Sequence, residues 1–147
     1  MPGVWKRNKT LAKAGSFGLI LKGNKMIEAL SGKIHHAVVT DSNKEYVGSI
    51  TIAQELLDAA NILQWQKVLV ACVESGERFE TYAMPGKPGE IIVNGAAANK
   101  VKKGERLIIM AFHFVEPHWI GTNRTGHEAV LPPKIVIVDA NNKIVHK

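Results

Sequence analysis

The sequence predicts a mostly-β protein, built as a barrel or a sandwich, with little helix. Three observations support this fold class: many short runs are rich in β-branched residues, one segment has helical periodicity, and turn-forming residues separate the runs. The 147 residues are enough for one domain with a hydrophobic core. No internal repeat, low-complexity segment or composition change divides the chain after residue 25 into two domains.

Four elements are expected in the first half of the domain. The run "KIHHAVVT" (33–40) is an apolar strand that ends at the polar turn "DSNK" (41–44). The run "EYVGSITI" (45–52) is a second strand, although Gly48 weakens its centre and indicates a bulge, a bend or a close backbone approach. Residues 53–63 follow as a helix, because their apolar residues recur at helical spacing. These positions are Leu56, Leu57, Ala60 and Leu63.

The second half of the chain alternates strands with turns. Strands are expected where apolar residues are continuous or alternate with polar ones, and turns where Gly, Pro or Asn gather. The predicted elements are a buried strand (66–75), an alternating strand (78–84), the turn "PGKPG" (85–89), a short strand (90–95), a helical turn and loop (96–105), a long apolar strand (106–115), an irregular loop (116–133), and a strand, an Asn-Asn turn and a final strand (134–147).

The net charge of +6 comes from one end of the chain. Residues 1–25 contain six Lys and Arg residues and no acid, whereas the remainder has 13 basic and 13 acidic residues. A formally neutral body argues against nucleic acid as a partner. We expect residues 1–25 to be a poorly ordered extension and Met26 to begin the domain. A targeting peptide, a nucleic-acid-binding arm and an upstream start are the alternatives.

Several signals of other functions are weak. The single cysteine, Cys72, lies in an apolar run and is expected to be a small buried hydrophobic residue, which fits a reducing, cytoplasmic setting. No apolar run approaches the length that spans a membrane. Three scattered histidines have no tight ligand spacing, so no metal site is expected. They are His113, His118 and His127.

Three segments together carry a family resemblance. They are "GKIHHAVVT", "YVGSITI" and "RFETYAMPGKPGEIIVNGAAA", and in this order and at these separations the chain resembles the aspartate 1-decarboxylases. These are pyruvoyl-dependent enzymes of pantothenate biosynthesis. The resemblance extends from Met26 to about Val115, and more loosely to the C-terminus. It implies a double-psi β-barrel with one or two short helices, and a cytoplasmic homotetramer with active sites between neighbouring subunits.

The resemblance also implies that the protein processes itself. The family is made as an inactive proenzyme, and the matching cleavage site is the bond between Gly48 and Ser49. The Ser49 hydroxyl attacks the preceding carbonyl to give an ester, and β-elimination followed by hydrolysis converts residue 49 into a covalent pyruvoyl group. Glycine permits the backbone geometry that such an attack needs, and the developing oxyanion needs a donor. Thr81 matches the family residue that supplies this hydroxyl.

The implied reaction converts L-aspartate into β-alanine and CO₂. The substrate amine forms a Schiff base with the pyruvoyl carbonyl, which draws in electrons as CO₂ leaves, and Tyr82 matches the residue that returns the proton. Arg78 and Lys33 match positions that bind the substrate carboxylates. The family's substrate-binding turn matches Asn94, Gly95, Ala96 and Ala97, and the pocket neighbours implied by the first two segments are His35 and Tyr46.

Strand alternation constrains two pairs of neighbouring residues. His35 and His36 should face opposite ways and should not line one pocket together. Thr81 and Tyr82 should likewise lie on opposite faces of their strand, with Arg78 on the side of Tyr82. Either that strand is distorted, or Thr81 and Tyr82 act in different steps.

Each of these predicted roles, and the predicted activity itself, has a simpler alternative. Gly-Ser alone is commonly a bulge or a turn, Arg78 and Lys33 could be solvated surface charges, and Tyr82 could simply pack its ring. The chain could also be an unprocessed proenzyme, or one that needs a maturation partner. A further alternative is a module that binds nucleic acid or a membrane surface through its basic tail. One methylene gives only about 1–3 kcal/mol of discrimination, so glutamate stays open as a substrate.

Overall fold

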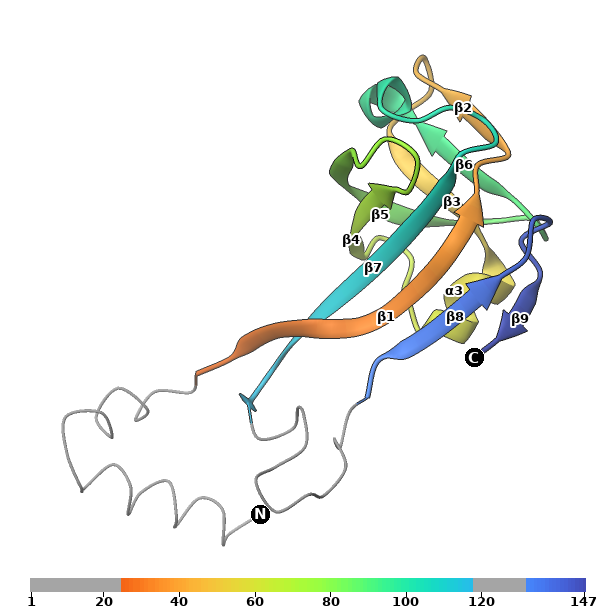
Figure 1. Ribbon diagram of the computed structural model, residues 1–147. Coiled ribbons are helices and arrows are strands. Elements are labelled where there is room, and N and C mark those ends of the chain that lie inside the picture. Colours follow the sequence, from red (N-terminus) through yellow and green to blue (C-terminus); the bar gives the residue numbers. More distant parts are fainter. Residues whose placement is uncertain (1–24, 118–131) are drawn as a thin grey trace, which may run out of the picture. The chain divides into compact units, whose positions relative to one another are not determined.

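The computed structural model describes residues 25–117 and 132–147, and these residues are mostly strand (Figure 1). Within them the chain forms nine strands, one α-helix and one 3-10 helix. The elements are β1 (Ile27–Val38), β2 (Asp41–Asn43), β3 (Ser49–Ala53), α3 (Gln54–Ala60), β4 (Lys67–Cys72), β5 (Arg78–Gly86), β6 (Ile91–Asn94), the 3-10 helix η1 (Gly95–Asn99), β7 (Arg106–Val115), β8 (Lys134–Val138) and β9 (Ile144–His146). The predicted mostly-β class with little helix is confirmed.

The strands form one mixed sheet in the order β2-β6-β3-β5-β4-β7-β1-β8-β9. Three neighbouring pairs are parallel, β1 with β8, β2 with β6 and β3 with β5. The pairs β3–β6, β4–β5, β4–β7 and β8–β9 are antiparallel. Figure 1 shows the long strands β1 and β7 side by side, with β8 along the other edge of β1. The two psi crossings of the expected barrel stay a prediction.

The core is built from strand residues that alternate inward. Ile50 and Ile52 of β3, Val70 of β4 and Ile109 of β7 have no exposed surface. The inward face of α3 adds Leu56, Leu57 and Ala60, as its helical spacing predicts. The fourth predicted position, Leu63, is wrong, because the helix ends before it and its side chain is exposed. Gly32 of β1 lets this helix approach, because a Cβ there would lie 1.9 Å from the carbonyl oxygen of Ala60. The helix ends at Asn61, which adopts the left-handed conformation typical of a C-terminal cap.

Most predicted elements are found, but the chain around the Gly-Ser pair differs from the prediction. Residues 41–43 form the short strand β2 instead of a turn, because they pair in parallel with residues 92–94 of β6. Residues 45–48 are not strand, and β3 begins at Ser49. The turn therefore begins at residue 44, three residues later than predicted. Polar residues at 41–43 indicated a turn, but Asp41 and Asn43 face away from the core while the backbone still pairs with β6.

The expectation that His35 and His36 face opposite ways is wrong. The two rings stack, with centroids 3.8 Å apart and planes 26° apart. His36 has a φ of 66°, in the left-handed region that strands avoid. The interruption also changes the burial phase of β1, because the buried Ile34 is followed by the buried Ala37 three residues later instead of two. A bulge at His36 thus brings both rings to one side.

A buried asparagine holds the C-terminal hairpin in place. Asn142 is only 2% exposed, and its Oδ1 accepts a hydrogen bond of 2.7 Å from the backbone N–H of Val38. Its Nδ2 donates to the carbonyl oxygens of Val38 at 2.9 Å and of Gly89 at 3.0 Å. The predicted Asn-Asn turn is present, and this side chain ties it to β1 and to the loop before β6.

Contacts divide the chain into two units. One comprises Leu30–His113 and Leu131–Lys147, and the other Met1–Ala29 and Phe114–Val130. The site residues predicted from the sequence all belong to the first unit. The expected extension (1–25) and the expected loop (116–133) lie almost entirely outside the described residues, as do His118 and His127. Among the helices of the described residues, none is long and apolar enough to cross a membrane.

Candidate active site

The Gly48-Ser49 pair lies where the β2–β3 loop enters a buried strand. Ser49 is the first residue of β3 and is 5% exposed. It stands directly opposite Asn94, the last residue of β6, in the antiparallel register. Asn94 is itself 5% exposed. The structure therefore brings together a buried hydroxyl and a buried amide that the sequence places 45 residues apart.

Three strands present their polar residues on one face at this point. Ser49 and Thr51 of β3 pair with Asn94 and Ile92 of β6, which in turn pair with Asn43 and Asp41 of β2. The intervening residues, such as Ile50 and Val93, point into the core. Because strand side chains alternate, the Ser49 face is the outer face of the sheet.

Gly95 packs closely against the backbone of Gly48. Its φ is 68°, and a Cβ there would lie 2.7 Å from the Cα of Gly48 and 3.4 Å from the carbonyl oxygen of Tyr46. No side chain fits into that space without displacing main chain. The turn "NGAAA" therefore packs directly on the Gly48 backbone, and its glycine is required for both conformation and space.

The loop before Ser49 is closed by Asn43. The Asn43 Oδ1 accepts a hydrogen bond of 3.0 Å from the backbone N–H of Glu45, which forms an Asx turn. The Asn43 carbonyl accepts a longer hydrogen bond, 3.4 Å, from the N–H of Tyr46. The loop is thus held by Asn43 on one side and by Gly95 on the other.

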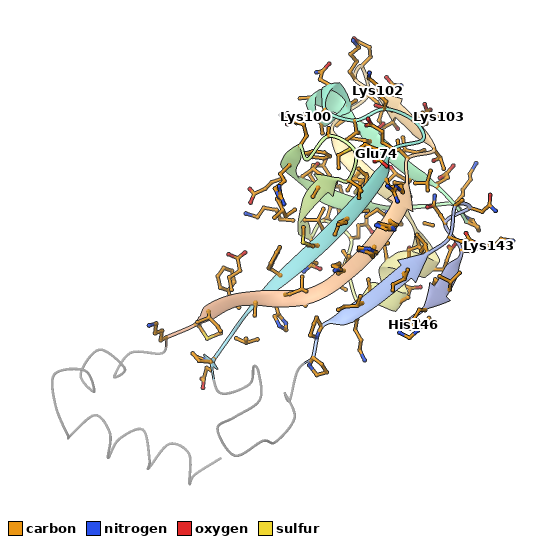
Figure 2. The ribbon with its side chains drawn as sticks, viewed as in Figure 1. Glu74, Lys100, Lys102, Lys103, Lys143 and His146 are labelled. Carbon is orange, nitrogen blue, oxygen red and sulfur yellow. The ribbon has the colours of Figure 1, made fainter. Side chains whose placement is uncertain are left out.

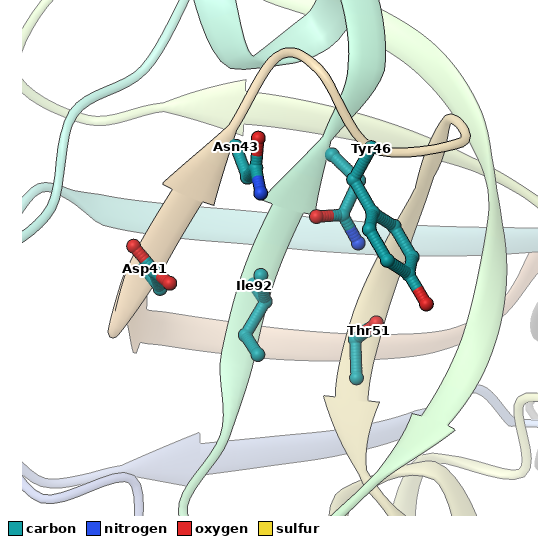
Figure 3. Close-up of a pocket in the computed structure, with 6 residues that line it drawn as sticks. Asp41, Asn43, Tyr46, Thr51 and Ile92 are labelled. Carbon is teal, nitrogen blue, oxygen red and sulfur yellow. The ribbon is translucent and has the colours of Figure 1, made fainter.

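An open pocket of about 240 Å³ lies on this face (Figure 3). Figure 3 shows Asp41 and Asn43 on β2 at one side and the ring of Tyr46 extending toward Thr51 at the other. The pocket is smaller than the roughly 300–1,000 Å³ of sites for drug-sized ligands, and its size suits a small metabolite. Its lining residues are Asp41, Asn43, Tyr46, Thr51, Ile92 and Asn94.

Thr81 and Tyr82 lie on opposite faces of β5. Ile50 of β3 pairs with Ala83 of β5, and both are fully buried. Tyr82, the residue before Ala83, therefore lies on the same outer face as Ser49, at the same end of the two paired strands. Thr81 pairs with the buried Val68 and points the other way. The strand is regular here, so Tyr82 shares the face of Ser49 and Thr81 does not.

The two predicted cations lie away from Ser49 within one chain. Arg78 is exposed and donates a hydrogen bond of 3.4 Å from Nη1 to the carbonyl of Gly76. It is four residues from Tyr82 along β5, which corresponds to roughly 13 Å. Lys33 is in β1, separated from β3 by several strands of the sheet. Among the described residues, no carboxylate forms an ion pair with either of them.

Other charges near Arg78 are already paired. Glu74 accepts a hydrogen bond of 2.7 Å from Nε of Arg106, and these hydrogen bonds from Arg106 lower the pKa of the Glu74 carboxyl. Lys100 pairs with Glu77 at 2.6 Å. Lys100, Lys102 and Lys103 belong to the connection between η1 and β7 (Figure 2).

His35 lies beside the bulge in β1 and away from the residues that line the pocket. Burial, and then the positive charges of His36, Lys33 and Arg106, lower its pKa. Its Nδ1 is buried with no hydrogen-bond partner among the described residues. His35 does not line the pocket described above, whereas Tyr46, the other expected neighbour, does.

Sequence reasoning missed four residues of this region. Asp41 and Asn43 were assigned to a turn, although their i, i+2 spacing is the signal that puts both on one strand face. Thr51 lies two residues after Ser49 in β3, so the two side chains also share one strand face. Trp65 stacks on the Tyr82 ring with centroids 5.6 Å apart, and nothing in the local sequence marks that contact.

The fold and the site together describe a small, mostly-β protein with a buried Gly-Ser junction beside a metabolite-sized pocket. The sequence model of one family, aspartate decarboxylase, matches residues 25–145. The chain therefore belongs to the aspartate decarboxylase family.

Curated relatives carry the name aspartate 1-decarboxylase. The protein of Caldicellulosiruptor saccharolyticus is 48% identical over 122 residues, which cover 82% of this chain and 89% of the relative. That of Campylobacter concisus is 56% identical over 119 residues, 81% of this chain and 96% of the relative. That of Neisseria meningitidis is 49% identical over 118 residues, 78% and 86% respectively.

Proposed function

We propose that the chain cleaves itself between Gly48 and Ser49 and then decarboxylates L-aspartate to β-alanine and CO₂. The observation that carries this proposal is the packing at the junction. Gly95 presses on the Gly48 backbone, Ser49 is buried beside Asn94, and a pocket opens on the same face. Family membership supports the reaction, and this packing supports Gly48-Ser49 as the proposed site of cleavage.

The residues around Ser49 fit a pyruvoyl group formed from it. An ester formed at a solvated serine would be open to hydrolysis by water, whereas Ser49 is buried and lies opposite the Asn94 amide. Gly95 packs on the backbone of Gly48, but no heavy atom lies within 4 Å of the position where a Cβ of Gly48 would lie, so that side of Gly48 is open. The new chain end can therefore form without displacing the core behind β3.

The cleavage and the formation of the pyruvoyl group would proceed in three steps. The Ser49 Oγ bonds to the Gly48 carbonyl carbon as the peptide C–N bond breaks, which leaves an ester and a free amine. Loss of the Ser49 Cα proton and the Oγ–Cβ bond releases the Gly48 carboxylate. Water then displaces ammonia from the resulting dehydroalanine and leaves the ketone. A serine hydroxyl is a weak nucleophile, so the close packing of Gly95 on Gly48 would serve to hold the reacting atoms in place.

We propose that Thr81 is the oxyanion donor, as the family resemblance implies. Its position in the uncut chain means that β5 would have to change conformation for this role. Its side chain points away from the Ser49 face in the intact chain. Donation to the oxyanion would require β5 to distort during cleavage. The Asn94 amide, opposite Ser49, is a nearer donor in the uncut arrangement.

In decarboxylation, the pyruvoyl carbonyl would act as the electron sink for the departing CO₂. The chain's own residues would bind and protonate. Tyr82, on the outer face with Ser49, would hold the phenolic proton that returns to the substrate carbon. Asn94 and the small residues Gly95, Ala96 and Ala97 would let the substrate approach the main chain closely.

The substrate carboxylates need cations, and we propose that a homotetramer completes the site. Arg78 and Lys33 have no carboxylate partner among the described residues and lie away from the pocket of their own chain. The Ser49 face is the outer face of the sheet, so a neighbouring subunit can place its cations over it. The cytoplasm, where a reducing setting suits the free Cys72, is the proposed location.

The test measures processing and product separately. Purified protein is incubated, separated on a denaturing gel and assayed for β-alanine from L-aspartate, with L-glutamate as the competing substrate. We expect two fragments, β-alanine, and little turnover of glutamate. The Ser49→Ala variant should give one folded, full-length, inactive chain. Complete cleavage without β-alanine, or normal cleavage of Ser49→Ala, would overturn the proposal.

A further inference from the structure

Trp65 adopts a backbone conformation that a tryptophan rarely occupies. Its φ is 71°, and its side chain is exposed, with a relative exposure of 63%. Bulky residues avoid this left-handed region, which Asn and Gly tolerate. A strained, exposed aromatic residue gains nothing from core burial, so its position calls for another explanation.

Hydrogen bonds fix the backbone of Trp65 rigidly against β5. The Trp65 N–H donates to the carbonyl of Ala83 at 2.8 Å, and the Ala83 N–H donates to the carbonyl of Gln66 at 3.0 Å. The Gln66 side chain also stabilises the turn, because its Oε1 accepts a hydrogen bond of 2.9 Å from the Leu63 N–H. Its Nε2 donates to the carbonyl of Phe112 at 3.1 Å, which links the turn to β7.

The consequence of this rigid turn is a ring contact with Tyr82. The indole of Trp65 stacks on the phenol ring with centroids 5.6 Å apart and planes 26° apart. Tyr82 lies on the outer face of β5, next to Ala83, so the turn and the phenol are joined through one residue. On the same face of β5, Glu80 pairs with Lys67 at 3.4 Å in a solvated ion pair.

We infer that Trp65 is a positioning residue for decarboxylation: it holds the Tyr82 ring in the orientation from which the phenol delivers its proton. This inference rests on the proposed role of Tyr82. Without the indole, the phenol of an exposed-face tyrosine samples its other rotamers, and fewer turnovers find the proton in place. Cleavage at Gly48 does not use the phenol, so Trp65 acts on turnover and not on processing.

The first variant is Trp65→Asn. Asparagine suits the left-handed backbone, so the turn is expected to fold, and only the ring is lost. We expect normal cleavage, an unchanged KM for L-aspartate and a fall in kcat of about two- to tenfold, the range that follows from the strength of an aromatic pair. Trp65→Phe, which restores a ring, should recover most of the lost kcat.

Leu63→Ala is the matched control, because Leu63 belongs to the same turn and is 68% exposed, but it has no ring contact with Tyr82. It should leave kcat unchanged. An equal fall in kcat for Leu63→Ala and Trp65→Asn would overturn the inference, since it would indicate loss of a general apolar surface.

A double-mutant cycle with Tyr82→Phe separates the two proposals. We expect Tyr82→Phe to be cleaved but to turn over poorly, and Trp65→Asn to have no further effect on kcat in that background. A poor Tyr82→Phe with a fully active Trp65→Asn would overturn the role of Trp65 alone. A fully active Tyr82→Phe would overturn the assignment of the proton donor, and the inference with it. An undiminished effect of Trp65→Asn in the Tyr82→Phe background would also reject it.

Discussion

At the scale of single residues, Gly95 is constrained by two independent requirements. Its φ of 68° lies in the left-handed region, and a Cβ on it would lie only 2.7 Å from the Cα of Gly48. The first requirement concerns the stability of the fold, and the second concerns the proposed cleavage site. A substitution at another glycine that has a left-handed backbone but open space around it can separate the two requirements.

Gly95→Ala should reduce cleavage at Gly48 by at least about tenfold, which corresponds to about 1.4 kcal/mol. Its new Cβ would displace the Gly48 backbone, and the left-handed conformation alone would cost about 1–2 kcal/mol of stability. Gly104→Ala is the control, because Gly104 has a φ of 90° and open space around it. The measurements are the cleavage rate on a gel and the melting temperature. Equal cleavage rates for the two variants would contradict the account of Gly95.

His35 predicts a dependence of stability on pH. Burial and the neighbouring positive charges lower its pKa in the folded state below the ordinary value of 6.5. The unfolded chain therefore binds a proton more readily than the folded one, and stability is lost as the pH falls below that value toward the folded pKa. The His35→Gln variant should lose less melting temperature than the parent protein between pH values of about 7.5 and 5.5. His146→Gln, at an exposed position of β9, should behave like the parent.

The residues of the candidate site could be predicted only in part. Ser49, Asn94 and Gly95 followed from the family resemblance, and the structure brings them together. The stacking of Trp65 on Tyr82 could not be predicted, because it depends on a left-handed turn that hydrogen bonds to β5 create. The stacking of His35 and His36 has the same kind of origin, a bulge that strand alternation does not anticipate.

At the scale of elements, the β2–β3 loop contains Gly48 and so positions the bond that we propose is cleaved. Asn43 closes its first turn through its side chain, while the turn after β6 packs on its other end. The loop is thus fixed on both sides before cleavage. This arrangement suggests that Asn43 matters for processing although it lies five residues before Gly48 in the sequence.

Asn43→Ala should slow self-cleavage by about two- to tenfold, because it removes one hydrogen bond of about 0.5–1.5 kcal/mol that orders the loop. Asn43→Asp keeps the acceptor oxygen and should restore the rate. Asp139→Ala serves as the control, since Asp139 Oδ1 accepts from the N–H groups of Asn141 and Lys143 in a similar turn between β8 and β9. If Asp139→Ala slowed cleavage as much, the effect would be one of general stability.

Element prediction succeeded where burial and periodicity agree. The strand at 106–115 and the core face of the helix have continuous or regular apolar spacing, and both are found. The prediction failed at residues 41–48, where polar side chains face outward from a paired strand and apolar Tyr46 and Val47 lie in an exposed loop. Polarity reports which side is solvated, and it does not report whether the backbone is paired.

At the scale of the whole molecule, the C-terminal hairpin is held against the rest of the sheet by the pairing of β8 with β1 and by one buried side chain, Asn142. Asn142 satisfies the N–H and the carbonyl of Val38 and the carbonyl of Gly89 at once. The parallel pairing of β8 with β1 places this hairpin beside a strand more than 90 residues away in the sequence. No local pattern could have predicted that partner.

Asn142→Ala should lower the free energy of unfolding by about 1–3 kcal/mol, because it leaves buried backbone groups without partners. Asn141→Ala, at the exposed neighbouring position, should change it little. Chemical denaturation of the two variants gives the comparison. A loss of stability confined to Asn141→Ala would contradict the assigned role of Asn142.

The central claim, that the chain converts Ser49 into its own cofactor, is tested most directly by the intact mass of the purified protein. The account predicts two chains, one that ends at Gly48 and one that begins at residue 49 and is lighter by one NH₃ than a fragment starting with serine. A single uncut chain after prolonged incubation, or a second fragment that retains an N-terminal serine, would contradict it.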